Sequence, residues 1–259
     1  MPNIEVDGAS IWYSVDGRAD APPLLLIHSL ATTHELWARQ MAAFTAFARV
    51  IRYDMRGHGK STSPAGDITI EQLGRDALAV LDAAGVSRAD VAGVSIGGLT
   101  TLWLGEHAPA RVRRLVLANT GARLGTSDGW SARMRAVREG GMEVAADVAI
   151  PRWFTDGFRE NHADVVAAYR AMVLSCPLES YLGACAALRD ADLRSDAHRI
   201  AAPTLVIAGS EDQSTPPADS EWMRDNLPDA HLEMLEAAHL SNVERPVEFT
   251  QLVRGFLNS

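Results

Sequence analysis

The chain has 259 residues, a length that suits one large α/β domain or two average domains. Hydrophobic residues make up 47% of it and charged residues 22%, a balance typical of a folded globular protein rather than a disordered or fibrous one. The formal net charge of -9 disfavours nucleic acid and an anionic membrane as partners, since both attract basic surfaces.

The two cysteines, Cys176 and Cys185, have no CxxC spacing, so we expect free and buried thiols in a reducing compartment. The amino terminus lacks the basic segment and the following apolar segment of a secretory signal. No apolar run approaches the roughly 18 residues needed to cross a bilayer. These features predict a cytoplasmic protein without a membrane anchor, and they leave the oligomeric state open.

Short apolar segments rich in Val, Ile and Leu alternate along the chain with segments of helical periodicity. The predicted strands are residues 4–6, 11–15, 24–27, 50–53, 91–94, 115–118, 205–208 and 232–235. The predicted helices outside the central region are residues 70–84, 96–107, 218–226 and 247–257. Strands that alternate with helices require crossover connections, so we predict an α/β fold: a mostly parallel sheet covered on both faces, after an antiparallel hairpin.

The alternation stops between residues 121 and 195, where the periodicity is helical and no convincing strand is found. Helices are expected from Ser127 or Asp128 onward, at 159–174 and at 179–189. An all-helical insertion between two parts of one sheet is expected to cover the carboxyl edge of the strands, where open α/β sheets bind ligands. The predicted division is therefore a first core part (1–120), a helical cap (121–195) and a second core part (196–259).

Residues 93–98, Gly-Val-Ser-Ile-Gly-Gly, lie between a predicted strand and a predicted helix. A G-x-S-x-G pattern in this context is typical of a nucleophile elbow, because the small residues allow a strained turn that exposes the hydroxyl at the strand end. The pattern also arises by chance, and a structural glycine turn is the alternative. The strand-turn-helix context favours Ser95 as a nucleophile.

A serine hydroxyl needs a general base within hydrogen-bonding reach, and the base needs an acid that fixes its tautomer. Among the eight histidines, His239 follows the last predicted strand in a loop that would bring the imidazole over the carboxyl edge of the sheet. His239 is therefore the predicted base. The alternative is a histidine in an ordinary surface loop.

The acid is expected between the serine and the histidine in chain order. Asp212 lies just beyond the predicted strand 205–208 and is the predicted acid, with its neighbour Glu211 as the rival. Asp54 precedes the serine and so breaks the order. We expect it to brace the loop 54–61 instead.

An oxyanion hole requires two backbone N–H groups directed at the developing negative charge, each contributing about 3 kcal/mol in the transition state. One is predicted to be the amide of Ile96, the residue after the nucleophile. The other is predicted to come from the loop after strand 24–27, and Leu30 is the choice.

These segments together resemble the α/β-hydrolase superfamily over the whole chain. Further segments resemble the 3-oxoadipate enol-lactone hydrolases, at residues 117–125, 151–155, 185–194 and 215–218. Two positions depart from the pattern common in that family. Val94-Ser95-Ile96 stands where Leu-Ser-Met is frequent, and Ala31 replaces a glycine in the loop beside the oxyanion site.

The resemblance implies a serine hydrolase that opens 3-oxoadipate enol-lactone to 3-oxoadipate through an acyl-enzyme, in aromatic-acid catabolism and without a metal or organic cofactor. Such a substrate carries a carboxylate, which requires a cation in the cap. Arg133, on the same predicted helical face as Trp130, is the chosen cation, although a solvated helix face is the plainer reading of any one arginine. Trp153 is expected either to line the pocket or to pack the cap onto the core.

Other functions fit the same residues. A broad carboxylesterase, another lactonase or a cofactor-free perhydrolase would share every catalytic residue and differ only in the shape of the pocket. A non-catalytic ligand-binding receptor is a remote alternative, which the complete set of Ser95, Asp212 and His239 disfavours. In each case the expected partner is a small molecule, a lactone or ester for the enzymes.

Overall fold

A single sheet runs through the computed structural model, which describes residues 3–258. Its eight strands follow the order β1-β2-β4-β3-β5-β6-β7-β8. Their bounds are β1 Asn3–Val6, β2 Ala9–Asp16, β3 Pro23–Ile27, β4 Arg49–Tyr53, β5 Ala89–Val94, β6 Val112–Ala118, β7 Thr204–Gly209 and β8 Ala230–Leu235. β2 pairs antiparallel with β1 and with β4, and all other pairs are parallel. The predicted α/β fold with its amino-terminal hairpin is confirmed.

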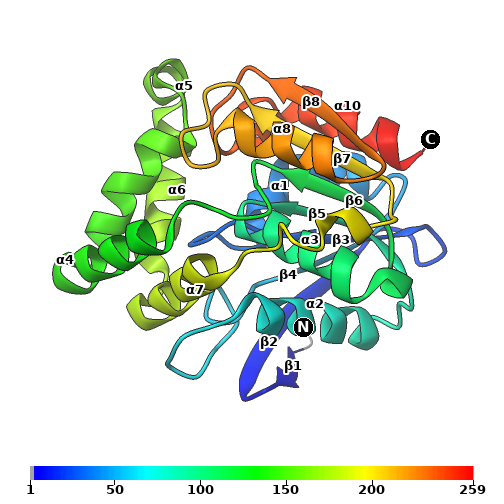
Figure 1. Cartoon of the computed structure of the whole chain (residues 1–259), viewed down its shortest axis with the longest axis horizontal. Coiled ribbons are helices and arrows are strands. Elements are labelled where there is room, and N and C mark those ends of the chain that lie inside the picture. The colour runs from blue at the N-terminus through cyan, green and yellow to red at the C-terminus, as the bar shows by residue number, and fades with distance from the viewer. Residues whose placement is uncertain (1–2, 259) are drawn as a thin grey trace.

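Helices cover both faces of the sheet, with α1 and α10 packed together on one face and α2, α3 and α8 on the other (Figure 1). Their bounds are α1 Ala38–Phe44, α2 Ile70–Ala83, α3 Ile96–His107, α8 Pro217–Asn226, α9 Ser241–Glu244 and α10 Pro246–Leu257. Three short 3₁₀ helices complete this part, namely η1 His34–Trp37, η2 Pro109–Arg111 and η3 Ala197–Arg199.

Local sequence explains most of these elements. β5 and β7 are buried at every residue, as expected for central strands of a parallel sheet that is covered on both faces. α2 begins with a capping box, in which the Thr69 hydroxyl accepts from the Gln72 amide at 3.1 Å and the Gln72 side chain accepts from the Thr69 amide at 2.9 Å. Both patterns were readable in the sequence.

Four α-helices lie between β6 and β7 and stand to one side of the sheet (Figure 1). These cap helices are α4 Ser127–Trp153, α5 Asp156–Asn161, α6 Ala163–Ser175 and α7 Leu178–Asp190. The expected single helix at 159–174 is wrong at its start. His162 has φ -134° and ψ 47°, which is not helical, so α5 ends before it and α6 begins after it. The three-part division of the chain stays a prediction.

The long helix α4 is broken once along its length. Gly141 has φ 74° and ψ -172°, while the residues on either side are helical. A Cβ at Gly141 would meet no atom within 4 Å, so its backbone conformation, rather than lack of space, favours glycine. The break separates a leading half, residues 127–140, from a trailing half, residues 142–153.

The sheet reverses its strand order beside β3, since β4 lies on one side of it and β5 on the other. The pairing of Ile27 with Gly93 brings the carboxyl ends of β3 and β5 together. Open α/β sheets bind ligands at such a point. The loop carrying Leu30 and the turn carrying Ser95 therefore meet at this edge.

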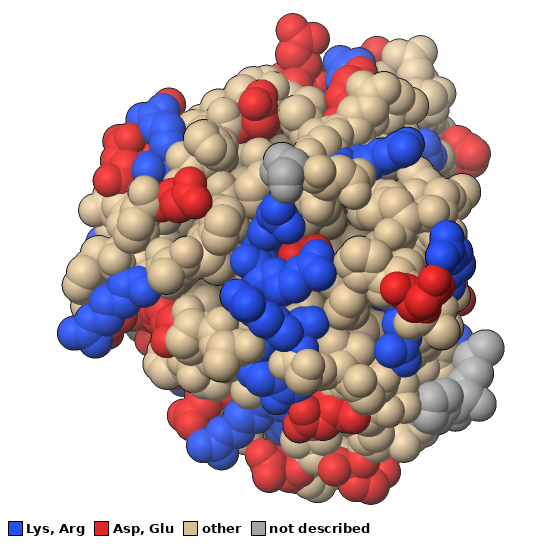
Figure 2. Space-filling view, turned by 90° about the vertical axis from the view of Figure 1, so that its right-hand side faces the viewer, with Lys and Arg blue, Asp and Glu red and all other residues tan. Residues whose placement is uncertain are grey.

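Charge is distributed unevenly over the surface. The net charge is -9, yet Figure 2 shows a face on which Lys and Arg side chains form an almost continuous band. The expectation that no nucleic acid binds, which rested on net charge, stays a prediction. Within residues 3–258, no single helix is long and apolar enough to cross a membrane, although α6 and α7 together would pass that test as a pair bent by 95°.

Candidate active site

Ser95 occupies a strained turn between β5 and α3. Its φ of 59° and ψ of -121° lie where side chains are rarely found, at a cost of about 1–2 kcal/mol. The flanking glycines make the turn possible. A Cβ at Gly93 would lie 2.1 Å from the Gly97 carbonyl oxygen, and one at Gly97 would lie 2.5 Å from the His28 carbonyl oxygen.

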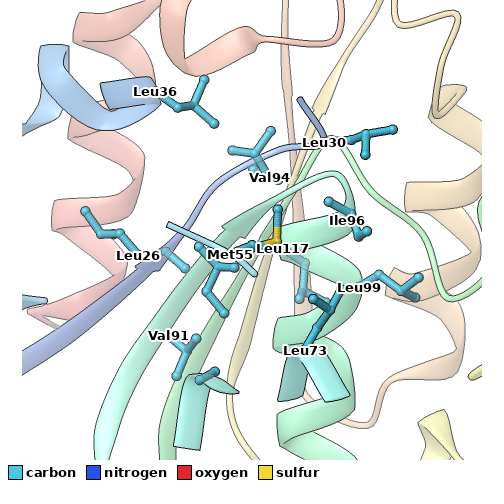
Figure 3. Close-up of a cluster of buried hydrophobic side chains, with 14 of the residues drawn as sticks. Leu26, Leu30, Leu36, Met55, Leu73, Val91, Val94, Ile96, Leu99 and Leu117 are labelled. Atoms are coloured by element: carbon cyan, nitrogen blue, oxygen red, sulfur yellow. The ribbon is translucent and has the colours of Figure 1, made fainter. Parts of the chain in front are cut away.

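The elbow rests on buried apolar side chains and on hydrogen bonds from the next strand. Figure 3 shows Val94, Ile96 and Leu117 among the residues packed around it. The Ser95 amide donates to the Ala118 carbonyl at 3.0 Å, and a hydroxyl from just after β6, that of Thr120, donates to the Ser95 carbonyl at 2.7 Å. These contacts hold the backbone of the strained residue.

Asp212 and His239 form a buried hydrogen-bonded pair above the ends of β7 and β8. The Nδ1 of His239 lies 2.8 Å from Oδ2 of Asp212, and both side chains are almost fully buried. Asp212 also accepts from the hydroxyl of Thr215 at 2.7 Å, from the Thr215 amide at 2.9 Å and from the Ser214 amide at 2.8 Å. Burial by itself would raise the pKa of Asp212, but the interaction with His239 and the Thr215 hydrogen bonds outweigh it and lower that pKa.

The two neighbouring acids, Asp212 and Glu211, have different surroundings. Glu211 is exposed, and its amide donates to the Ala237 carbonyl at 3.0 Å. Asp212 is the one that contacts His239. An ionised Asp212 bound to Nδ1 keeps the other ring nitrogen, Nε2, free to accept a proton.

Asn119 was missed by the sequence analysis. It lies directly after β6 with φ 46°, a conformation that asparagine tolerates better than most residues. Its amide donates to Asp212 at 3.1 Å and to the Ala238 carbonyl at 3.2 Å, and its oxygen accepts from the Ser241 hydroxyl at 2.5 Å. Asn119 thereby connects the acid to the loop that carries His239. Its position at the end of a parallel strand was the one available signal.

The two amides predicted for an oxyanion hole lie at the same edge. Ile96 is the first residue of α3, where N–H groups have no intrahelical acceptor. Throughout residues 3–258, the Leu30 amide finds no hydrogen-bond acceptor. Ala31, in the same loop, has φ 56°, a backbone conformation that favours glycine.

His28 fixes the loop that carries Leu30. Its Nε2 accepts from the Met55 amide at 2.9 Å, so its Nδ1 carries the proton that is donated to the Ser29 carbonyl at 2.8 Å. Burial, with a contribution from nearby His58, lowers the pKa of His28 to about 3, so it is neutral at ordinary pH. The neutral form is the one that makes both hydrogen bonds.

Asp54, which the sequence analysis placed in a bracing role, accepts three hydrogen bonds. They come from the His34 amide at 2.7 Å, the His34 ring at 2.8 Å and the Lys60 amide at 2.9 Å. Arg56 in the same loop forms a buried ion pair with Asp76 at 2.6 Å. These contacts fix the loop 54–61 against its neighbours.

A cavity of about 520 Å³ connects the sheet edge with the cap helices. This volume is within the range of small-molecule sites. Ser95 and His239 both line it, as do Leu30 and Ser29, whose buried hydroxyl has no partner within the described part of the chain. The cap contributes a mostly apolar wall that includes Trp130, Ala132, Arg133, Ala136, Val137, Val144, Val148, Ala149, Arg152, Trp153, Val173, Tyr181 and Leu188.

Arg133 is held in that wall by aromatic neighbours. Its Nε donates to the Tyr181 hydroxyl at 2.7 Å, and its guanidinium carbon lies 5.2 Å from the centre of the Trp130 ring. The Trp130 indole donates to a backbone carbonyl, that of Leu124, at 2.6 Å. Arg152 also lines the cavity and was missed by the sequence analysis.

The other arginines near the start of the cap, Arg123, Arg135 and Arg138, do not line the cavity. Arg123 is 3.7 Å from Asp192, while Arg135 and Arg138 are exposed and absent from the cavity wall. Trp153 is 95% buried and lines the cavity. Among the described residues, no group of three or more His, Cys, Asp or Glu side chains is arranged to hold a metal ion.

The fold and this edge of the sheet define an α/β hydrolase. A family model described as the alpha/beta hydrolase fold matches residues 22–163. A 3-oxoadipate enol-lactonase of Acinetobacter baylyi is 40% identical over 95% of this chain and 92% of its own length. The chain belongs to the α/β hydrolase family and, within it, to the same family as the 3-oxoadipate enol-lactonases; it is a hydrolase.

Solved structures agree with this assignment. The enol-lactonase of Burkholderia xenovorans superposes with a TM-score of 0.97 at 39% identity, and each chain is covered completely. A hydrolase of Pseudomonas aeruginosa superposes with a TM-score of 0.97 at 42% identity, covering 100% of this chain and 98% of its own. The likeness extends over the cap helices as well as the sheet.

Proposed function

We propose that this protein hydrolyses 3-oxoadipate enol-lactone to 3-oxoadipate, with Ser95 as nucleophile, His239 as general base and Asp212 as the acid that orients the base. The observation that carries the proposal is that Ser95, His239 and Arg133 line the same cavity, whose cap wall is mostly apolar. Enol-lactonases at 37–40% identity over most of the chain support the same substrate. A carboxylated lactone needs both features, a nucleophile and a cation.

His239 Nε2 takes the proton of the Ser95 hydroxyl as the oxygen attacks the lactone carbonyl. The amides of Leu30 and Ile96 donate to the oxyanion that forms. The ring C–O bond then breaks, and the imidazolium returns the proton to the departing oxygen. This oxygen leaves as an enol that converts to a ketone, so it leaves more readily than an ordinary alcohol.

A water molecule completes the cycle. His239 removes a proton from this water while the water oxygen attacks the acyl-enzyme. The proton then passes to the Ser95 oxygen as the acid is released. Asp212 remains ionised throughout, which is supported by its lowered pKa. Ser95 lines the cavity in a strained conformation, and its hydroxyl makes no capping hydrogen bond to the first turn of α3.

The substrate carboxylate binds Arg133. Trp130 and Tyr181 hold the guanidinium at the apolar wall, so the charge meets the carboxylate with little competing water. Such a charge-assisted hydrogen bond contributes about 1.5–3 kcal/mol. Trp130 and Trp153 supply apolar surface around the ring, and Arg152 is a second cation within the same cavity.

A second candidate function is the hydrolysis of other small esters or lactones. The cavity volume of about 520 Å³ supports this second function, because a small lactone does not fill a site of that size and a larger ester would fit. An esterase of Thermogutta terrifontis and an N-acyl homoserine lactone degrading enzyme share this fold at 25% and 29% identity. The catalytic residues would be unchanged.

The chain division and the cellular location complete the proposal. Residues 1–120 and 196–259 form the core, and residues 121–195 form the cap over its carboxyl edge. The protein acts in the cytoplasm on a small molecule and without a cofactor. Free, buried Cys176 and Cys185 support a reducing compartment.

Hydrolysis of 3-oxoadipate enol-lactone, followed by the loss of its ultraviolet absorbance, tests the proposal. The native protein and Ser95→Ala are compared on this lactone and on an activated aryl ester. Rapid lactone opening that Ser95→Ala abolishes is the expected result. Ester cleavage without lactone opening would reject the substrate and favour the second candidate, whereas turnover by Ser95→Ala would reject the serine mechanism.

A further inference from the structure

Glu244 joins the cap helices to the loop that carries His239. It is half-buried at the end of α9, five residues after the histidine. One carboxylate oxygen, Oε1, accepts from the Thr155 amide at 2.8 Å and from the Thr155 hydroxyl at 2.9 Å. The other, Oε2, accepts a short hydrogen bond from the Ala238 amide. A single side chain thus links the segment after α4 to the loop that carries His239.

Thr155 is a rigid attachment point for this bond. It follows the trailing half of α4 and caps α5, where its hydroxyl oxygen accepts from the Phe158 amide at 3.2 Å. The hydroxyl therefore donates to Glu244 and accepts from Phe158 at once. The Glu244 carboxylate is therefore held at the junction of α4 and α5. Thr155, which binds it there, lies two residues after Trp153 of the cavity wall.

Three consecutive backbone amides of the loop that carries His239 donate to Glu244 or to carbonyls at the end of α4. The Ala238 amide donates to Glu244, the His239 amide to the Arg152 carbonyl at 3.4 Å and the Leu240 amide to the Trp153 carbonyl at 3.1 Å. The loop has left the regular pairing of β8 at this point. The amides of its backbone are held by the end of α4 and by Glu244, while its carbonyls at Ala237 and Ala238 accept from residues just after β7 and β6.

We infer that Glu244 is a positioning residue for the reaction: its carboxylate sets the backbone of His239 against the cavity wall of the cap. The inference rests on the proposed role of His239 as the base. Because α4 ends at this junction, the wall that surrounds the substrate and the base that acts on it share one anchor. Loss of the carboxylate lets the imidazole move relative to Ser95, and misplacement of this kind lowers the rate of the chemical step.

Glu244→Gln is the first variant to measure. Glutamine keeps the shape but offers one acceptor oxygen, so it presents an NH₂ group to either Thr155 or Ala238. Active-site titration with an aryl phosphonate counts the functional serines, and kcat is expressed per titrated site. We expect kcat per site to fall between about 10-fold and 100-fold on both the lactone and an activated aryl ester. KM is expected to change less.

Glu248→Gln is the matched control, because it removes an exposed carboxylate in the first turn of α10 that has no hydrogen bond or ion pair with any described residue. It should keep native kcat and KM. Thr155→Val removes one donor to Glu244 and is expected to lower kcat per site about threefold. In the double variant the two effects should not multiply, since both remove the same link.

Native kcat per titrated site in Glu244→Gln would overturn the inference, including the case in which fewer sites are titrated and each works normally. Multiplying effects in the double variant would also overturn it. If Glu244→Gln does not fold, Thr155→Val decides alone, and unchanged kcat then counts against the inference. The aryl ester readout stays valid if the native protein fails to open the lactone, and Ser95→Ala separately tests the serine mechanism.

Discussion

The sheet edge and the cap wall hold their polar groups in different ways. Asp212 accepts hydrogen bonds from four residues and is almost fully buried. Arg133 donates one hydrogen bond, to Tyr181, and otherwise lies against aromatic rings. A dense network fixes the geometry needed for proton transfer, whereas an aromatic setting presents a charge and leaves it available to a ligand. With the proposed roles of Asp212 and Arg133, we expect mutations to separate the chemistry from the choice of substrate.

The largest expected effect is at the sheet edge. Asp212→Asn keeps the volume of the side chain but favours the wrong tautomer of His239, so kcat should fall by about 10⁴-fold on the lactone and on an aryl ester alike. Glu211→Gln is the control, because Glu211 is exposed and should keep native kcat. Steady-state kinetics on both substrates measure this. Equal losses in the two variants would mean that the acid has been misassigned.

The cap wall should respond on one substrate only. Arg133→Met removes the cation but keeps an apolar side chain, so kcat/KM for the carboxylated lactone should fall about 10-fold to 100-fold. An uncharged aryl ester should be cleaved at nearly the native rate. Arg138→Met, at an exposed position outside the cavity, is the control. Similar losses on both substrates would place Arg133 in the catalytic machinery instead and erase the contrast between the two regions.

A smaller effect comes from pH and tests the buried histidine at the sheet edge. The folded state holds His28 with its pKa lowered to about 3, whereas an unfolded histidine takes up its proton near pH ~6.5. The stability is fully present above pH ~6.5 and is lost as the pH falls toward 3, because only the unfolded state binds the proton in that window. Between pH 6.5 and 5 the His28 contribution to the unfolding free energy should fall by roughly 1.5 kcal/mol. Burial raises the pKa of Glu106 to about 7, which changes the unfolding free energy in the opposite direction over the same window, so urea titrations of Glu106→Gln should show the fall that the native protein partly cancels. His58, whose pKa burial also lowers, adds to this fall. A constant unfolding free energy over this range in Glu106→Gln would contradict a buried neutral His28.

Strands were predictable where local patterns decide the structure. The buried central strands consist mostly of apolar residues, and α2 begins at a capping box that is visible in the sequence. The cap was harder. The helical periodicity continues through His162, and the pair Gly140-Gly141, where α4 is interrupted, was not singled out in the sequence.

The candidate site followed the same rule. Ser95, Asp212 and His239 lie directly after strands, so chain order and strand ends were enough to select them. Asn119 and Glu244 act through contacts with residues far along the chain, such as Asp212 and Thr155. Such contacts become visible only when the ends of the strands and the cap are placed in space.

The interruption of α4 at Gly141 also limits how changes in chain length spread. In a continuous helix each inserted residue rotates everything beyond it by about 100°, since 3.6 residues make one turn. Trp130 and Arg133 lie before the interruption, and the carbonyls that bind the histidine loop lie after it. An insertion or deletion in the leading half can be absorbed at Gly141 without turning Arg152 and Trp153. The part of the cavity wall that carries Trp130 and Arg133 is thus open to remodelling by length as well as by substitution, while the carbonyls that bind the histidine loop keep their register.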